Sequence, residues 1–149
     1  MMQTSIEPNT ELKWVLILCT GNSCRSQMAE AIVNYTLAGQ VRAWSAGTRP
    51  QAQVAAGAIA ALKDANLPTD ELYPKDVNDV LELPFDLVVT VCNNAKEICP
   101  IFPRPVPKIH LPFHDPHGEP TASFIQVRND IQAQLIPAIC QALGIELVN

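Results

Sequence analysis

The chain has 149 residues, of which 48% are hydrophobic and 17% charged, so we expect a globular protein rather than a disordered one. Its formal net charge of −5 argues against nucleic acid or an anionic membrane as a partner. No apolar run approaches the roughly 20 residues of a membrane span. We interpret residues 1–12 as a disordered tail without signal-peptide character and residues 13–149 as a single domain.

The cysteine content points to a reducing compartment. The five cysteines are an odd number without the density of a secreted disulfide scaffold, so we expect a cytoplasmic protein with reactive or buried thiols. No two cysteines stand in a Cys-x2-Cys pair, which argues against a structural zinc site. The cysteines are Cys19, Cys24, Cys92, Cys99 and Cys140.

Strand-like and helical segments alternate along the chain. Apolar or alternating stretches predict strands at residues 14–18, 41–46, 85–91 and 108–113. Periodic stretches predict helices at residues 27–35 and 54–65, a short one at 76–83, and a last one that begins near Ser123 with Ser123 and Gln126 as a capping box. This alternation predicts an α/β fold of three layers, a four-stranded parallel sheet with helices on both faces.

The first predicted strand runs directly into a loop suited to anions, residues 19–26, and a helix follows the loop. Backbone N–H groups at a helix start favour negative charge, and ligands gather at the carboxyl edge of such sheets. We expect Cys19 to ionise more easily than a free thiol, Arg25 to clamp a tetrahedral oxyanion, and Ser26 to cap the helix and donate to the Cys19 sulfur. The expected oxyanion-binding residues are Thr20, Gly21, Asn22, Ser23, Cys24 and Arg25.

An inert buried cysteine beside an ordinary surface arginine is the plainer alternative, but Cys, Gly, Arg and Ser all stand where an anion loop needs them. The pattern Cys-x5-Arg-Ser resembles the phosphate loop of low-molecular-weight protein tyrosine phosphatases and of the arsenate reductases that share their fold. The resemblance covers most of the chain and implies a phosphatase-like fold with flavodoxin-like topology. Phosphatases of this fold typically carry Pro where this chain has Gln27, and a tyrosine pair where it has His117-Gly118.

Cys92 and Cys99 stand seven residues apart, about 10 Å on a regular helix, whereas a disulfide needs Cα atoms within about 7 Å. Spacing alone therefore favours two separate buried cysteines. Residues 91–100, however, resemble the cysteine pair of thioredoxin-coupled arsenate reductases. Asp115-Pro116 alone is a turn signal, but it matches the catalytic aspartate of the family, the general acid.

The resemblance implies reduction of arsenate to arsenite, an activity of arsenic resistance, by a thiol relay. Cys19 is the nucleophile, and Cys92 and then Cys99 carry the disulfide to an external dithiol, thioredoxin or a glutaredoxin–glutathione system. We expect a monomer without a tightly bound cofactor. The first alternative is a phosphatase that uses Cys19, Arg25 and Asp115 only. The second is an oxyanion-binding or redox-sensing module without turnover.

Asn22 and Glu30 match positions that bind a monovalent cation in some relatives. From the residues alone, it is at least as good an interpretation that Asn22 holds a left-handed turn and that Glu30 is solvated. The chain also departs from the family between residues 66 and 76, which weakens a cation site built on that segment. His110, His114 and His117 lie near Asp115 in the sequence without the spacing of metal ligands, so we predict no other metal site.

Overall fold

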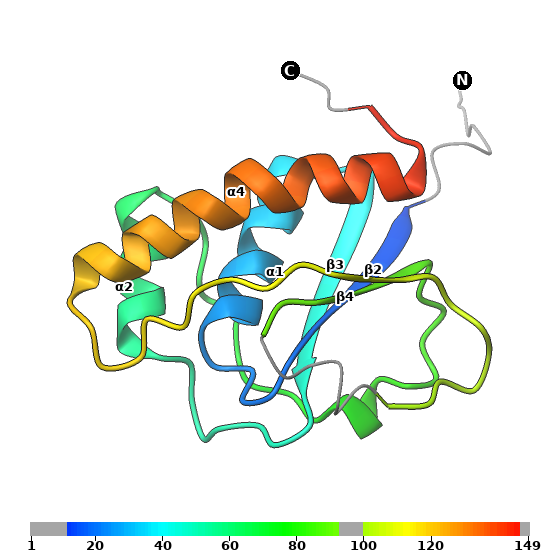
Figure 1. Cartoon of the computed structure of the whole chain (residues 1–149), viewed down its shortest axis with the longest axis horizontal. Coiled ribbons are helices and arrows are strands. Elements are labelled where there is room, and N and C mark those ends of the chain that lie inside the picture. The colour runs from blue at the N-terminus through cyan, green and yellow to red at the C-terminus, as the bar shows by residue number, and fades with distance from the viewer. Residues whose placement is uncertain (1–11, 93–99, 147–149) are drawn as a thin grey trace.

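The computed structural model describes residues 12–92 and 100–146, and a parallel sheet of four strands runs through them (Figure 1). Strand β2 (Lys13–Cys19) lies between β3 (Val41–Gly47) and β4 (Leu87–Thr90), and β5 (Lys108–His110) forms the edge beside β4. The order β3-β2-β4-β5 with parallel pairing throughout confirms the predicted α/β sheet. The expected tail at residues 1–12 falls almost wholly outside the described residues, and so does Cys99.

Strand β2 is apolar on both faces because both are covered. Val15 and Ile17 pack into the larger core on the helical side, whereas Leu16 and Leu18 pack into a smaller core on the other side. All four side chains are at most 3% exposed. The central position of β2 therefore confirms the buried strand that the continuous apolar run at residues 14–18 predicted.

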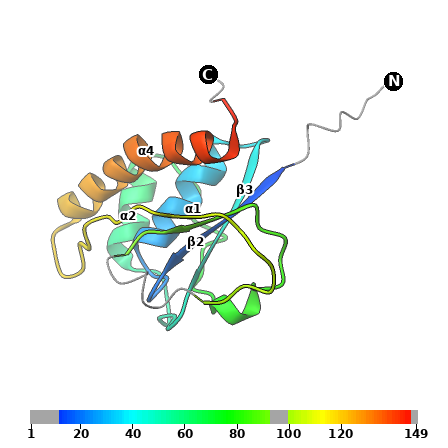
Figure 2. The same cartoon turned by 45° about the vertical axis from the view of Figure 1, so that its right-hand side comes forward.

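Helices α1 (Arg25–Thr36), α2 (Ala56–Asp64) and α4 (Thr121–Leu143) pack together on one face of the sheet (Figures 1 and 2). In the described residues the other face is covered by a short 3-10 helix, η2 (Val77–Asp79), and by the chain around Phe85. The third layer is thus present, but its described part is a 3-10 turn and loops where an α-helix over residues 76–83 was expected.

Helix α4 begins two residues before the expected start. Pro120 is its N-cap, with extended backbone and no side-chain capping bond, so the capping box predicted for Ser123 and Gln126 is wrong. Proline is well suited to a helix entrance because it needs no N–H partner. The Gln126 amide instead donates to Asp130 one turn further on, at 2.9 Å.

The carboxyl edge of the sheet collects the residues that the sequence singled out. Strand β2 ends at Cys19, which pairs with Gly47 at the end of β3, and Cys92 follows the end of β4 by two residues. Asp115 lies in the loop that follows β5. Among the described residues, no helix combines the length and apolar character needed to cross a membrane.

Candidate active site

Cys19, Arg25 and Asp115 help to line a pocket of about 380 Å³ beside the loop after β2, and the segment after β3 holds the backbone carbonyl groups of that loop. Three of these carbonyls accept hydrogen bonds of 2.8 to 2.9 Å from the following segment: Thr20 from Arg49 N, Gly21 from Gln51 N and Ser23 from Ala55 N. A trans peptide points its N–H opposite its C=O. The N–H groups that follow these carbonyls therefore point away from the segment after β3, as an oxyanion-binding loop requires.

Asn22 holds the bend of the loop. Its φ of 48° lies in the left-handed region, as the plainer interpretation of this residue predicted, and its side chain is fully buried. The Asn22 amide donates to Ser26 Oγ at 2.8 Å and to Ser45 Oγ at 2.9 Å. Gln27 Nε2 donates to the Asn22 carbonyl oxygen at 2.9 Å. The bend is therefore fixed from both sides, by α1 and by β3.

Ser26 does not cap helix α1 as expected. The N-cap is Cys24, without a side-chain capping bond, and Ser26 lies one position inside the helix. Its hydroxyl oxygen accepts from the Asn22 amide, because the left-handed bend brings that amide over the first turn of the helix. Ser26 thus supports the loop rather than the helix start.

Cys19 lines the pocket, and Cys92 lies close to it at the same edge of the sheet, with Cys92 Sγ 3.6 Å from Thr20 Oγ1. Interaction with the Cys19 thiol is the main cause that lowers the pKa of Cys92 to about 5, and Thr20 lowers it further. The same interaction, together with burial, raises the pKa of Cys19, while Arg25 acts in the opposite direction. The pKa of Cys19 is thus raised in the oxyanion-free site, the direction opposite to the expected one.

Arg25 and Asp115 meet at the mouth of the pocket. The Arg25 guanidinium donates to the Phe113 carbonyl oxygen at 3.0 Å and lies 3.5 Å from an Asp115 carboxylate oxygen. The Arg25 side chain is 12% exposed and the Asp115 side chain 51%, so the carboxylate faces the opening. Asp115 Oδ1 also accepts from the His117 backbone at 3.1 Å, a turn that holds the loop in place.

The other cysteines of the described residues are Cys24, which lines the same pocket, and Cys140, which lies on α4. Burial, with help from Asp115, raises the pKa of Cys24 to about 12, and burial also raises the pKa of Cys140 on α4. The sequence did not single out four other residues that line the pocket, because only the fold brings them to it: Arg49, Gln51, Ala55 and Phe124.

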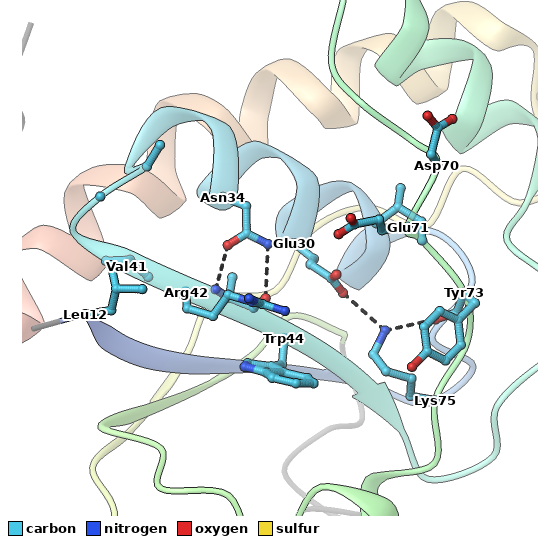
Figure 3. Close-up of a pocket in the computed structure, with 14 residues that line it drawn as sticks. Leu12, Glu30, Asn34, Val41, Arg42, Trp44, Asp70, Glu71, Tyr73 and Lys75 are labelled. Atoms are coloured by element: carbon cyan, nitrogen blue, oxygen red, sulfur yellow. Dashed lines mark hydrogen bonds and ion pairs between the residues drawn. The ribbon is translucent and has the colours of Figure 1, made fainter.

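The two residues considered for a monovalent cation, Asn22 and Glu30, are linked through Ser45. Its hydroxyl accepts from Asn22 and donates to Glu30 Oε1 at 2.6 Å. The Lys75 ammonium lies 3.3 Å from the same Glu30 oxygen, so Glu30 is not solvated but paired (Figure 3). Within the described ranges no group of three or more His, Cys, Asp or Glu side chains could hold a metal ion.

Comparison with known proteins identifies the family. Residues 14–146 match the family described as low molecular weight phosphotyrosine protein phosphatase. An arsenate reductase 1 of Bacillus cereus is 40% identical over 127 residues, covering 83% of this chain and 91% of that protein. The crystal structure of an arsenate reductase from Archaeoglobus fulgidus superposes with a TM-score of 0.72 at 28% identity, covering 84% of this chain and 98% of the other.

A thioredoxin-dependent arsenate reductase of Corynebacterium glutamicum shares the fold with a TM-score of 0.68 at 22% identity, covering 89% of this chain and 63% of that one. The match over residues 14–146 shows that the chain belongs to the low molecular weight phosphotyrosine protein phosphatase family. Within that family it is similar to proteins named arsenate reductase, which confirms the resemblance drawn from the loop and the cysteine pair.

Proposed function

We propose that this protein reduces arsenate to arsenite, with Cys19 as the nucleophile and Cys92 as the second thiol of a relay. The observation that carries the proposal is a second buried thiol, Cys92, at the anion loop: it follows the strand beside β2, and its sulfur lies 3.6 Å from Oγ1 of Thr20, the residue next to Cys19 in the sequence. Hydrolysis of a phosphate ester needs one nucleophilic thiol, the clamp Arg25 and the acid Asp115. A second thiol beside the loop is needed only if electrons leave through sulfur.

In the first step the Cys19 sulfur forms a bond to arsenic in the oxyanion held by the loop amides and Arg25. The Cys19 proton passes to an arsenate oxygen as the bond between sulfur and arsenic forms. An As–O bond breaks, and the departing hydroxide takes a proton from Asp115 and leaves as water. The product of this step is an arsenic ester of Cys19, with arsenic still pentavalent.

In the second step the Cys92 thiolate attacks the Cys19 sulfur. A sulfur–sulfur bond forms, the As–S bond breaks, and its two electrons reduce arsenic to the trivalent state, which leaves as arsenite. Phosphorus has no comparably accessible trivalent state, so a phosphate ester cannot follow this route. The lowered pKa of Cys92 suits it to attack without a separate base.

In the third step Cys99 attacks Cys92, forming a Cys92–Cys99 disulfide and releasing Cys19. Cys99 lies outside the described residues, and its part rests on the resemblance of residues 91–100 to the reductase cysteine pair. An external dithiol then reduces the disulfide. A thioredoxin is our first choice because a relative of the same fold is named thioredoxin-dependent, with a glutaredoxin–glutathione system as the alternative. The cytoplasm supplies both reductants.

Mapping the thiols by mass spectrometry tests the relay. The fully reduced protein is incubated with arsenate or with phosphate, alkylated and digested. We expect a Cys92–Cys99 disulfide with arsenate only, both in the wild type and in a matched Cys140→Ser control. If all thiols remain free while an aryl phosphate is hydrolysed, the reductase proposal is wrong and the phosphatase alternative replaces it.

A further inference from the structure

Lys75 is a buried charge whose ammonium contacts Glu30 and Tyr73 (Figure 3). Its side chain is only 7% exposed, and its ammonium lies 3.3 Å from Glu30 Oε1. The ammonium also donates to the Tyr73 carbonyl oxygen at 2.9 Å and lies 4.5 Å from the centre of the Tyr73 ring. Burying an ammonium costs free energy unless it is paired, so such a residue is expected to have a function that outweighs the cost.

A closed ring of hydrogen bonds joins Lys75 to the bend of the loop. The Asn22 amide donates to Ser45 Oγ at 2.9 Å, and Ser45 donates to Glu30 at 2.6 Å. Glu30 accepts from the Lys75 ammonium, and the Lys75 backbone N–H donates to Asn22 Oδ1 at 2.7 Å. Both ends of the Asn22 side chain are therefore held by a ring that contains one negative and one positive charge.

Asn22 and Glu30 are the residues considered above for a monovalent cation, and in this chain they do not fit one. The Lys75 ammonium already neutralises Glu30, and two side-chain oxygens of these residues, Glu30 Oε1 and Asn22 Oδ1, accept hydrogen bonds from Lys75. A second cation at this place would lie against the ammonium and would lose those bonds.

We propose that Lys75 is a positioning residue that does internally what a bound monovalent cation would do. It neutralises Glu30 and keeps Asn22 in its left-handed bend, so that the loop amides face the oxyanion. The consequence is that oxyanion binding by this protein is independent of the monovalent cation in solution. The effect on oxyanion binding holds for either reaction, while the effect on arsenate turnover rests on the proposed function.

The surroundings of Lys75 make the proposal testable by rescue. Lys75 and Glu30 line a pocket of about 780 Å³, whose other acidic side chains are Asp70 and Glu71 (Figure 3). Truncation of Lys75 would leave the Glu30 carboxylate facing a space that an added cation can enter. A small cation should therefore restore the function in the variant and should have no effect on the wild type.

The probe is inorganic phosphate, whose dissociation constant is measured by calorimetry in potassium, methylammonium or tetramethylammonium chloride at equal ionic strength. Lys75→Ala is compared with Lys63→Ala, which removes an exposed lysine from the end of α2. We expect Lys75→Ala to weaken phosphate binding by about tenfold or more in tetramethylammonium, the scale of lost hydrogen bonds to charged groups. Potassium or methylammonium should recover most of this loss, and Lys63→Ala should match the wild type.

The proposal would be overturned if the wild-type protein bound phosphate severalfold more tightly in potassium than in tetramethylammonium chloride. This part of the experiment needs no variant. Lys75→Ala with unchanged affinity, or with a loss that no small cation repairs, would overturn it as well. Lys75→Arg keeps the charge and should bind phosphate within about threefold of the wild type. Because phosphate binding is the readout, the proposal can fail while arsenate reduction stands, and the reverse.

Discussion

The interaction between Cys19 and Cys92 shifts the pKa values of the two thiols in opposite directions before substrate arrives. The pKa of Cys92 is lowered to about 5, so the pair carries one negative charge at neutral pH and loses it as the pH falls through about 5. The pKa of Cys19 is raised, so its own thiolate does not add to that charge. The resting enzyme is thus prepared for the second step before the first has occurred.

Thiolate absorbance in the ultraviolet checks this distribution of charge. We expect the wild-type protein to show one thiolate that titrates near pH 5. Cys92→Ala should abolish this step, because it removes both the ionised sulfur and the acceptor of the Cys19 proton, whereas Cys140→Ala should leave it in place. A wild-type titration in which every thiolate appears only in the alkaline range would contradict the assignment.

Asp115 lies 3.5 Å from Arg25 at the mouth of the pocket. Its effect on turnover can therefore be measured separately from its effect on oxyanion binding. Asp115→Asn removes the proton donor and should lower kcat for arsenate by about 100-fold or more. The same change removes a negative charge beside Arg25, so phosphate should inhibit the variant at least as tightly as the wild type. Steady-state kinetics with phosphate as inhibitor measures both, and a loss of phosphate affinity would contradict the assignment of Asp115 as an acid.

Strand β3 ends against the phosphate loop at Gly47, where a close approach requires glycine. A methyl group added at Gly47 would collide with the Thr20 carbonyl oxygen and press on Asn22. Thr20 already accepts a hydrogen bond from the Arg49 backbone, so it cannot move without breaking the bond that orients the loop. The end of β3 therefore shapes the site although it contributes no catalytic side chain.

Gly47→Ala should accordingly abolish most of the thermal stabilisation that phosphate gives the wild-type protein. The phosphate-dependent shift in melting temperature measures this effect. Arg42→Ala, on the exposed side of the same strand, serves as the control and should keep the full shift. An unchanged shift in Gly47→Ala would show that the loop can accommodate the methyl group.

The elements that the sequence predicted best are those with a strong local pattern. The strand at residues 14–18 and the loop after it form as expected. Each depends on a short stretch of sequence, because burial on both faces produces a continuous apolar run and the loop follows the Cys-x5-Arg-Ser spacing. The start of α4 was misplaced because Ser123 and Gln126 satisfy the capping spacing, while Pro120 supplies a backbone suited to the helix entrance. Local spacing does not reveal which of two adequate starts the chain uses.

Contacts between distant segments account for the part of the site that the sequence could not predict. The ring of hydrogen bonds around Lys75 joins four separate segments: Asn22 lies in a loop, Glu30 on a helix, Ser45 on a strand and Lys75 in an irregular segment. These hydrogen bonds exist only once β3 lies beside β2. The pairing of Cys19 with Cys92 likewise depends on β2 and β4 being neighbours. Parallel strands predicted that both cysteines reach one edge, but not that the pKa values of their thiols shift in opposite directions.

In the proposed reaction this protein passes two electrons from Cys19 and Cys92 to arsenic. The most direct test is a single turnover without external reductant, in which arsenite released from the fully reduced protein is counted against Cys92→Ser. We predict close to one arsenite per wild-type chain and none from the variant, with phosphate binding retained in both. Arsenite released equally by Cys92→Ser, or absent from a wild type that hydrolyses an aryl phosphate, would contradict the account.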